Sequence, residues 1–162
     1  MEWIRYVDTL NDHYRSQGNP PYRWSVNESA PLHRLSKPLT ECKVSVLTSG
    51  GVSQCAMPAF NPNAKNDHRL DAIAFDTESS DFQVHDNYYD HTDAEEDINC
   101  IFPLDRLREL ADKGEIGSVA PRLWSGFMGR IYNRTKIAEE SGPAFANALL
   151  ADGVDILLAA PT

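Results

Sequence analysis

The chain has 162 residues, enough for one domain that can build a core without disulfides or metal. With 41% hydrophobic and 24% charged residues it is not a disordered chain, and no apolar run approaches the ~18 residues of a membrane span. The net charge is −9, and residues 42–100 contribute −8 of it, from 3 basic and 11 acidic side chains. Because such a surface repels phosphate backbones, we expect no nucleic-acid partner and interpret the acidic stretch as a solvated loop region.

We expect neither a secretory signal nor a cysteine motif in this sequence. Its start, MEWIRYVDTLNDHYR, carries charge throughout and has no apolar segment of the kind a secretory signal needs. Cys42, Cys55 and Cys100 have no partner at motif spacing, so we expect neither a disulfide framework nor a metal site. A cytoplasmic location without membrane association is therefore the expectation.

The amino-terminal region predicts a helix followed by an arm. Four apolar side chains recur at helical spacing within residues 2–17: Ile4, Val7, Leu10 and Tyr14. Gly18 is the expected end of this helix. Residues 19–41 contain four prolines and predict an extended arm, with Tyr22 and Trp24 as anchors. We thus expect residues 1–41 to form a helix and arm, and residues 42–162 to form an α/β domain.

The middle of the chain predicts two strands separated by long loops. The apolar run Lys43–Leu47 indicates a buried strand, and Thr48–Gly51 indicates a tight loop after it. Residues 52–70 and 76–97 are expected to be loops, whereas residues 70–75 could form a second strand.

The last third alternates helices with strands. A helix around Leu104–Ala111 should close at Gly114, and residues 116–120 predict a strand that ends at Pro121-Arg122. Ser141 is the expected cap of the last helix, which should stop at Gly153 with three side chains facing inward: Phe145, Leu149 and Leu150. Residues 154–160 predict a strongly apolar strand.

This alternation indicates an α/β fold with a mainly parallel sheet and flanking helices, whose central strands are Val44–Leu47, Ile116–Val119 and Val154–Ala159. Ligands bind outside the carboxyl ends of parallel strands, which is where the loops at 48–51, at 121–129 and after residue 160 should lie. Since residues 154–160 read as a core strand, we expect the sheet to be incomplete within this sequence or completed by a further chain.

Two segments at expected strand ends could bind an anionic ligand. Thr48-Ser49-Gly50-Gly51 offers hydroxyl groups and close backbone approach to a carboxylate or phosphate, although a plain glycine turn explains the same residues. Arg122 could hold a carboxylate through two hydrogen bonds, or it could instead satisfy carbonyl groups of its own loop.

Two further residues could carry chemistry. His91 stands between Asp90 and Asp93, an arrangement suited to proton transfer, although an exposed histidine in an acidic loop is the simpler interpretation. Cys55 lies in the expected loop after the glycine pair and could be reactive, or it could be an inert thiol.

Three segments together resemble the glycine/sarcosine/betaine/D-proline reductase selenoprotein B family: KVSVLTSGG at 43–51, the long segment 87–129, and GVDILLAAPT at 153–162. The amino-terminal YRSQGNPPYRW is similar as well, and residues 52–66 depart from the family's pattern. The resemblance places Thr48, Ser49, Gly50, His91 and Arg122 on strand-end loops, and so implies that they line the pocket.

The resemblance also implies an activity, namely reductive cleavage of a small amino acid or its N-methylated derivative at the α-carbon. Its nucleophile would be a selenocysteine or cysteine directly after Thr162. A dithiol would supply the electrons, and a partner subunit would carry a pyruvoyl group. We therefore expect the natural product to be longer than 162 residues, with the selenocysteine codon UGA or a cysteine codon directly after that of Thr162. We also expect the chain to associate with other reductase subunits or with itself.

Two other functions remain open at this point. A non-catalytic binding or interaction module of the same fold would keep the pocket without the redox residue. A racemase or lyase without a cofactor would use Cys55 or His91.

Overall fold

The computed structural model describes residues 5–22, 26, 28–29 and 33–162. Contacts within the chain divide it into two compact units, Met1–Arg34 and Leu35–Thr162, and each unit is described by itself.

The first unit contains helix α1, Tyr6–Ser16, which ends ahead of Gly18 with its φ of +76°. The predicted helix is confirmed over the described residues, but none of its side chains is buried. Tyr22 contacts α1 because its backbone N–H donates to Asn11 Oδ1 at 2.9 Å and its ring packs edge-on against Tyr14. Trp24 and Ile4 lie outside the described residues.

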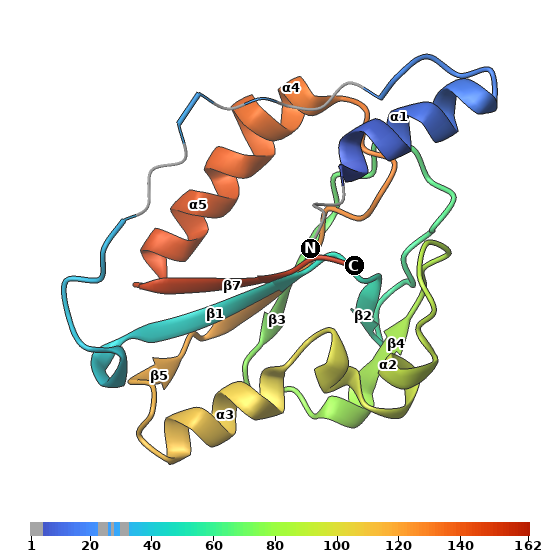
Figure 1. Ribbon diagram of the computed structural model, residues 1–162. Coiled ribbons are helices and arrows are strands. Elements are labelled where there is room, and N and C mark those ends of the chain that lie inside the picture. Colours follow the sequence, from blue (N-terminus) through green and yellow to red (C-terminus); the bar gives the residue numbers. More distant parts are fainter. Residues whose placement is uncertain (1–4, 23–25, 27, 30–32) are drawn as a thin grey trace. The chain divides into compact units, whose positions relative to one another are not determined.

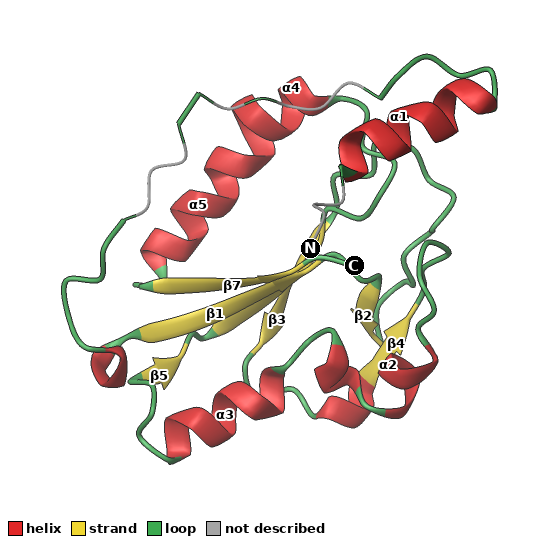
Figure 2. Cartoon of the chain, in the orientation of Figure 1, coloured by secondary structure: helices red, strands yellow, loops and turns green. Residues whose placement is uncertain are grey.

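The second unit is built on a sheet with strand β1, Lys43–Thr48, at its centre (Figures 1 and 2). β7, Ile156–Ala160, runs parallel to β1 along one side. Along the other side run β5, Ser118–Val119, and then β6, Arg122–Gly126, both parallel to β1. β3, Leu70–Ala74, pairs antiparallel with the far side of β6. The predicted α/β fold with a mainly parallel sheet is confirmed, but of the three strands expected at its centre only β1 lies there.

The expectation that residues 121–129 form a loop is wrong for residues 122–126. Pro121 has no N–H and interrupts the ladder between β5 and β6. The strand resumes at once because β6 has partners on both sides, with Trp124 level with Leu47 of β1 and Ala72 of β3. Pro121 therefore divides one extended segment into two strands, β5 and β6, instead of ending it.

Two expected loops contain regular structure. β2, Val52–Gln54, and β4, Phe82–Val84, form a separate antiparallel pair, and helix α2 spans Thr92–Glu96. Short 3-10 turns lie at Leu39–Glu41, Ser79–Asp81 and Ile98–Cys100. These elements are only three to five residues long, so tertiary packing of side chains such as Val52 decides their conformation more than local pattern does.

One face of the sheet carries the main core beneath helix α3, Leu104–Asp112 (Figure 1). Val44 and Val46 of β1 pack in this core with buried side chains that follow α2 and form α3: Ile98, Ile101, Phe102, Leu104 and Leu107. The expected helix stop at Gly114 is confirmed, with a φ of +69°.

The opposite face is covered by a long helical segment. It runs through α4, Arg134–Lys136, a π-helical stretch, Ile137–Ser141, and α5, Gly142–Ala151. The expectation that Ser141 caps the helix is wrong, because its backbone is already helical and its side chain makes no capping hydrogen bond. Phe145 is buried as expected, whereas Leu150 is 73% exposed and does not face inward.

Candidate functional site

The candidate site lies where β1, β6 and β7 end. Thr48, the last residue of β1, is level with Ser125 of β6 and Ala160 of β7, so the three strands reach the same edge. In sheets of this kind ligands bind outside the carboxyl ends of the strands. The loop Thr48–Gly51 and the residues after Ala160 lie at this edge.

The loop after β1 is tied to the chain that follows β7. Thr48 Oγ1 accepts a hydrogen bond from the Gly50 N–H at 3.2 Å, which closes the turn. The Ser49 N–H donates to the Ala160 carbonyl at 3.4 Å, and the Thr162 N–H donates to Ser49 Oγ at 3.3 Å. Ser49 therefore holds Thr162 at the carboxyl edge.

Both glycines of the loop have close neighbours, and those of Gly51 require glycine. A Cβ at Gly50 would lie 3.0 Å from the Tyr89 hydroxyl and 3.2 Å from Thr162 Oγ1. Gly51 has a φ of +69°, and a Cβ there would lie 2.2 Å from the His85 carbonyl oxygen. The loop thus packs backbone directly against the segment 85–91 and against Thr162.

Tyr89 is a functional candidate that the sequence analysis did not single out. Its hydroxyl donates to the Gly50 carbonyl at 2.9 Å. Burial raises the pKa of Tyr89 to about 12, and the carboxylates of Asp86 and Glu95 add to the shift. The hydroxyl is therefore a neutral hydrogen-bond donor at ordinary pH. No local pattern marks this residue, because its contact with Gly50 spans 39 positions of the sequence.

His91 stands next to Tyr89 and beside a carboxylate. The two rings meet edge to face with centroids 5.8 Å apart. His91 Nδ1 lies 2.8 Å from Glu95 Oε1, although no hydrogen bond to Nδ1 is aligned among the described residues. Glu95 is four residues after His91, so a prediction of helix α2 would have revealed the pair.

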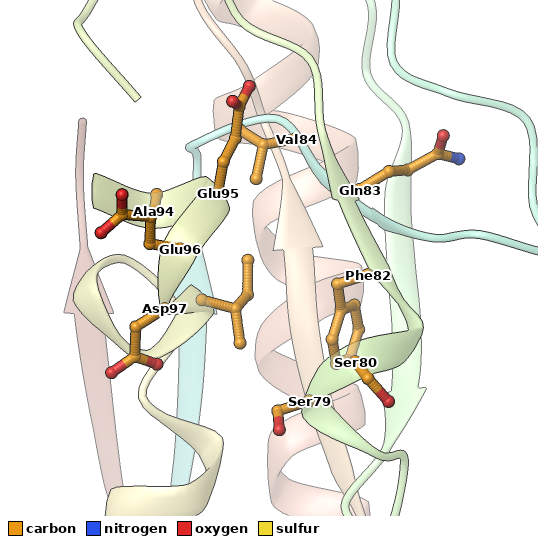
Figure 3. Close-up of a pocket in the computed structure, with 10 residues that line it drawn as sticks. Ser79, Ser80, Phe82, Gln83, Val84, Ala94, Glu95, Glu96 and Asp97 are labelled. Atoms are coloured by element: carbon orange, nitrogen blue, oxygen red, sulfur yellow. The ribbon is translucent and has the colours of Figure 1, made fainter. Parts of the chain in front are cut away.

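A cavity of about 360 Å³ lies between α2 and β4, beside this pair (Figure 3). Phe82, Val84 and Ala94 give it apolar walls, and Glu95, Glu96 and Asp97 line it on the α2 side, with the carboxyl groups of Glu96 and Asp97 directed away from β4. A cavity with this lining favours cationic over anionic ligands. Glu95 belongs both to the cavity and to the His91 pair.

The structure does not bring Arg122 to the carboxyl edge. Its carbonyl accepts from Ser45 Oγ, which sets it three residues, or about 10 Å, before Thr48 along the sheet. Its guanidinium binds both carboxylate oxygens of Asp152, at 2.8 and 2.9 Å, which raises the pKa of Arg122. Arg122 thus joins the sheet to the end of α5.

Cys55 is also separated from the loop. Residues 52–54 form β2 rather than a loop, so the chain runs extended for about 13 Å from Gly51 to Cys55. Cys55 is exposed, and its backbone N–H donates to the Asp81 carbonyl at 2.7 Å. The candidate site therefore combines Thr48–Gly51 with His91, together with Tyr89, Glu95 and Thr162.

Neither a metal centre nor a membrane span is found in the part of the chain that the structure describes. No group of three or more His, Cys, Asp or Glu side chains there could hold a metal ion. No helix among those residues is long and apolar enough to cross a membrane.

The fold and the site define a class of protein. It is an α/β chain in which hydroxyl groups and an imidazole, that of His91, lie near the glycine loop Thr48–Gly51 at the carboxyl edge of the sheet. The chain belongs to the glycine/sarcosine/betaine reductase selenoprotein B family, whose sequence profile matches residues 9–162. This confirms the resemblance seen in segments 43–51, 87–129 and 153–162.

Curated relatives support the same family. D-proline reductase subunit gamma of Acetoanaerobium sticklandii is 37% identical over 124 residues, which cover 76% of this chain and 50% of the relative. Glycine reductase complex component B subunit gamma of Carboxydothermus hydrogenoformans is 28% identical, over 83% of this chain and 31% of the relative. Sarcosine reductase complex component B subunit beta of Peptoclostridium acidaminophilum is 28% identical, over 87% and 33%. The chain thus spans half or less of the length of these relatives, and no solved structure matches it.

Proposed function

We propose that this chain is a component of a selenocysteine- or cysteine-dependent reductase that cleaves a small amino acid, or an N-methylated amino acid, at the α-carbon. The relatives named as D-proline, glycine and sarcosine reductase subunits support the substrate class. The observation that carries the proposal is the cluster of Ser49, Gly50, Tyr89 and Thr162 at the carboxyl edge, with His91 beside it.

The proposed reactive residue would follow directly after Thr162. Thr162 is hydrogen-bonded to Ser49 and packs against Gly50, so the next residue would emerge among hydroxyl groups at the edge. A selenolate or a low-pKa thiolate would supply a nucleophile that is already ionised at neutral pH. The hydroxyl groups of Ser49 and Thr162 fit such a group, because hydroxyl donors stabilise an anion beside them.

The chain's own residues would position and protonate the substrate. Glu95 Oε1 lies 2.8 Å from His91 Nδ1, and a hydrogen bond formed there would leave Nε2 to give a proton to the departing amine, as in other carboxylate–histidine pairs. Tyr89 would remain a neutral donor throughout, because its pKa is about 12. The carboxylates beside the cavity between α2 and β4 would attract the cationic amine of the substrate.

The partners in this proposal are the remaining reductase subunits, one of which would carry the pyruvoyl group, and the electrons would come from a dithiol. The relatives are named as subunits or as components of complexes, which supports a multi-subunit assembly.

The native gene provides the first test. We expect the codon after Thr162 to be UGA, read as selenocysteine, or a cysteine codon, followed by a frame that resembles the family. A UAA or UAG codon with no such frame would contradict the proposal and leave the non-catalytic module as the better explanation.

Activity of the full-length protein with its partner subunits provides the second test. Dithiol oxidation is measured with glycine, sarcosine, betaine and D-proline as substrates. His91→Gln should lower kcat by ~10²–10⁴-fold, the usual contribution of a general acid. Cys55→Ser is the control and should keep full activity. Activity lost with Cys55→Ser, in an enzyme that needs no dithiol, would favour the racemase or lyase instead.

A further inference from the structure

A second cavity, of about 320 Å³, lies on the other face of the sheet, between the sheet and α5. Its sheet wall is formed by residues from β3, from β6 and from the loops beside them: His68, Leu70, Trp124 and Phe127. Its helix wall is formed by residues spaced at i, i+3, i+4 and i+7, which is one helical face: Ser141, Ala144, Phe145 and Ala148. The volume lies at the lower end of the ~300–1,000 Å³ typical of ligand pockets.

The cavity exists because three of the four helix residues are small. Protein interiors are packed to the density of organic crystals, and larger side chains at Ser141, Ala144 or Ala148 would fill the space opposite Trp124. The sequence instead leaves room for water or a ligand. Phe145 narrows the cavity, with its ring 5.3 Å from that of Trp124 in an edge-to-face contact.

Two polar atoms of the lining residues have no hydrogen-bond partner among the described residues. Trp124 is only 5% exposed, and its Nε1 is buried without a partner. His68 Nδ1 is likewise buried without one. Since buried polar groups are nearly always paired, and an indole N–H can only donate, Trp124 calls for an acceptor atom that the described residues do not provide.

The lining of this cavity holds no carboxylate that would repel an anionic acceptor. None of its lining residues is acidic, in a chain of net charge −9, whereas the cavity between α2 and β4 is lined by three carboxylates. The Arg122 guanidinium lies 5.0 Å from the centroid of the Trp124 ring, and Asp152 balances its charge. The remaining walls are aromatic or aliphatic, so the rest of the ligand should be apolar.

We propose that this cavity binds a small monocarboxylate with an apolar body, whose carboxylate accepts a hydrogen bond from Trp124 Nε1. Leu70, Phe127 and Phe145 surround the apolar part, and His68 provides a second polar contact. The site lies on the α5 face of the sheet, and the inference does not rest on the reductase proposal.

The test uses the full chain and follows the indole N–H signals in ¹H–¹⁵N spectra, with Trp124→Phe assigning the Trp124 signal. The probe is 3-methylbutanoate, and its isosteric neutral control is 3-methylbutanamide. Millimolar 3-methylbutanoate should move the Trp124 signal downfield in a saturable way, with affinity about 10-fold or more above that of the amide, as for a charge-assisted hydrogen bond.

Two variants weaken the site by different routes. Trp124→Phe removes the donor but keeps an aromatic ring, and Ala148→Leu fills the cavity but keeps the donor. Both should weaken 3-methylbutanoate binding about 10-fold or more, measured by ligand-observed NMR. Ala146→Leu, on the exposed side of the same helix, is the matched control and should not change it.

Other outcomes overturn the proposal. Equal affinity for the acid and the amide would show that the carboxylate does not contribute to binding. Unchanged affinity in Trp124→Phe would show that the indole N–H does not donate to the ligand. No saturable binding at 10 mM would show that the cavity holds only water. Far-UV circular dichroism of each variant identifies one that does not fold, and the other variant then decides.

Discussion

The two ends of the sheet use polar side chains in different ways. At the amino end of β1, charged side chains pair with one another. Asp155 Oδ2 accepts a hydrogen bond from the Lys43 N–H at 2.7 Å and forms an ion pair with Lys37 at 2.7 Å. Asp152 binds Arg122. At the carboxyl end the polar groups are mostly neutral, and Ser49 and Tyr89 bond to backbone around two glycines. The first end fastens α5 and β7 to β1, whereas the second shapes a surface.

This difference shows that a charged residue near a strand end is weak evidence for a ligand site. Arg122 has the chemistry to bind a carboxylate, but Asp152 of its own chain already provides that carboxylate at two oxygens. A site is better indicated by a loop whose backbone packing requires glycine, as at Gly51. Variants at the two ends should therefore differ in kind as well as in size.

The largest effect is expected at Gly51. Gly51→Ala would place a Cβ 2.2 Å from the His85 carbonyl oxygen at a φ of +69°, and we expect a loss of about 3–5 kcal/mol in the free energy of unfolding. Gly114→Ala is the matched control, since it has the same φ of +69° but no atom within 4 Å, and should cost about 1 kcal/mol. Urea denaturation of both variants measures the difference, and equal losses would contradict the close packing at Gly51.

A smaller loss is expected at the amino end. Asp152→Ala removes the bidentate partner of Arg122, and we expect a loss of about 1–2 kcal/mol because Arg122 remains partly exposed to water. Asp112→Ala, at an exposed position late in α3, is the control and should stay within about 0.5 kcal/mol. Thermal unfolding measures both variants. If Arg122→Ala instead left stability unchanged and abolished amino-acid substrate binding, Arg122 would be a ligand residue and not a fastening one.

Tyr89→Phe should cost about 1 kcal/mol, the value of one hydrogen bond, here to the Gly50 carbonyl. Because the folded pKa is raised to about 12 from 10, the unfolded chain loses this proton first as pH rises. The stability that Tyr89 contributes is therefore complete below pH 10 and is lost as pH rises through 12. The absorbance difference between the native protein and Tyr89→Phe should titrate near pH 12, and a titration near pH 10 would contradict the buried hydroxyl.

The sequence predicted those parts of the fold in which local pattern and tertiary packing agree. The apolar runs at 43–47 and 154–160 and the helix closed by Gly114 all form where expected. β2, β4 and α2 were missed because each is too short for its periodicity to outweigh its polar composition, and they form through packing against the core.

The candidate site was predictable in part. The loop Thr48–Gly51 and His91 were both singled out, and the structure joins them through Tyr89. Glu95 and Tyr89 were missed because their contacts depend on α2 and on a fold-back of 38 residues after Gly51, neither of which the local pattern shows. Arg122 was misplaced because Pro121-Arg122 was taken as a strand end, whereas β6 begins at Arg122.

The smallest change in the free energy of unfolding is expected at Cys55, because this residue is exposed and lies apart from the residues of the carboxyl edge. Cys55 and Cys100 are exposed whereas Cys42 is 0% exposed, so an aromatic disulfide reagent should titrate two thiols rapidly in the native protein and the third only on unfolding. Cys55→Ser should lower that rapid count to one and change the free energy of unfolding by less than about 0.5 kcal/mol, because surface substitutions without special contacts are nearly neutral. A larger loss of stability, or a rapid count still at two, would show that Cys55 is packed against other groups. It would then have to be considered again beside the residues of the carboxyl edge.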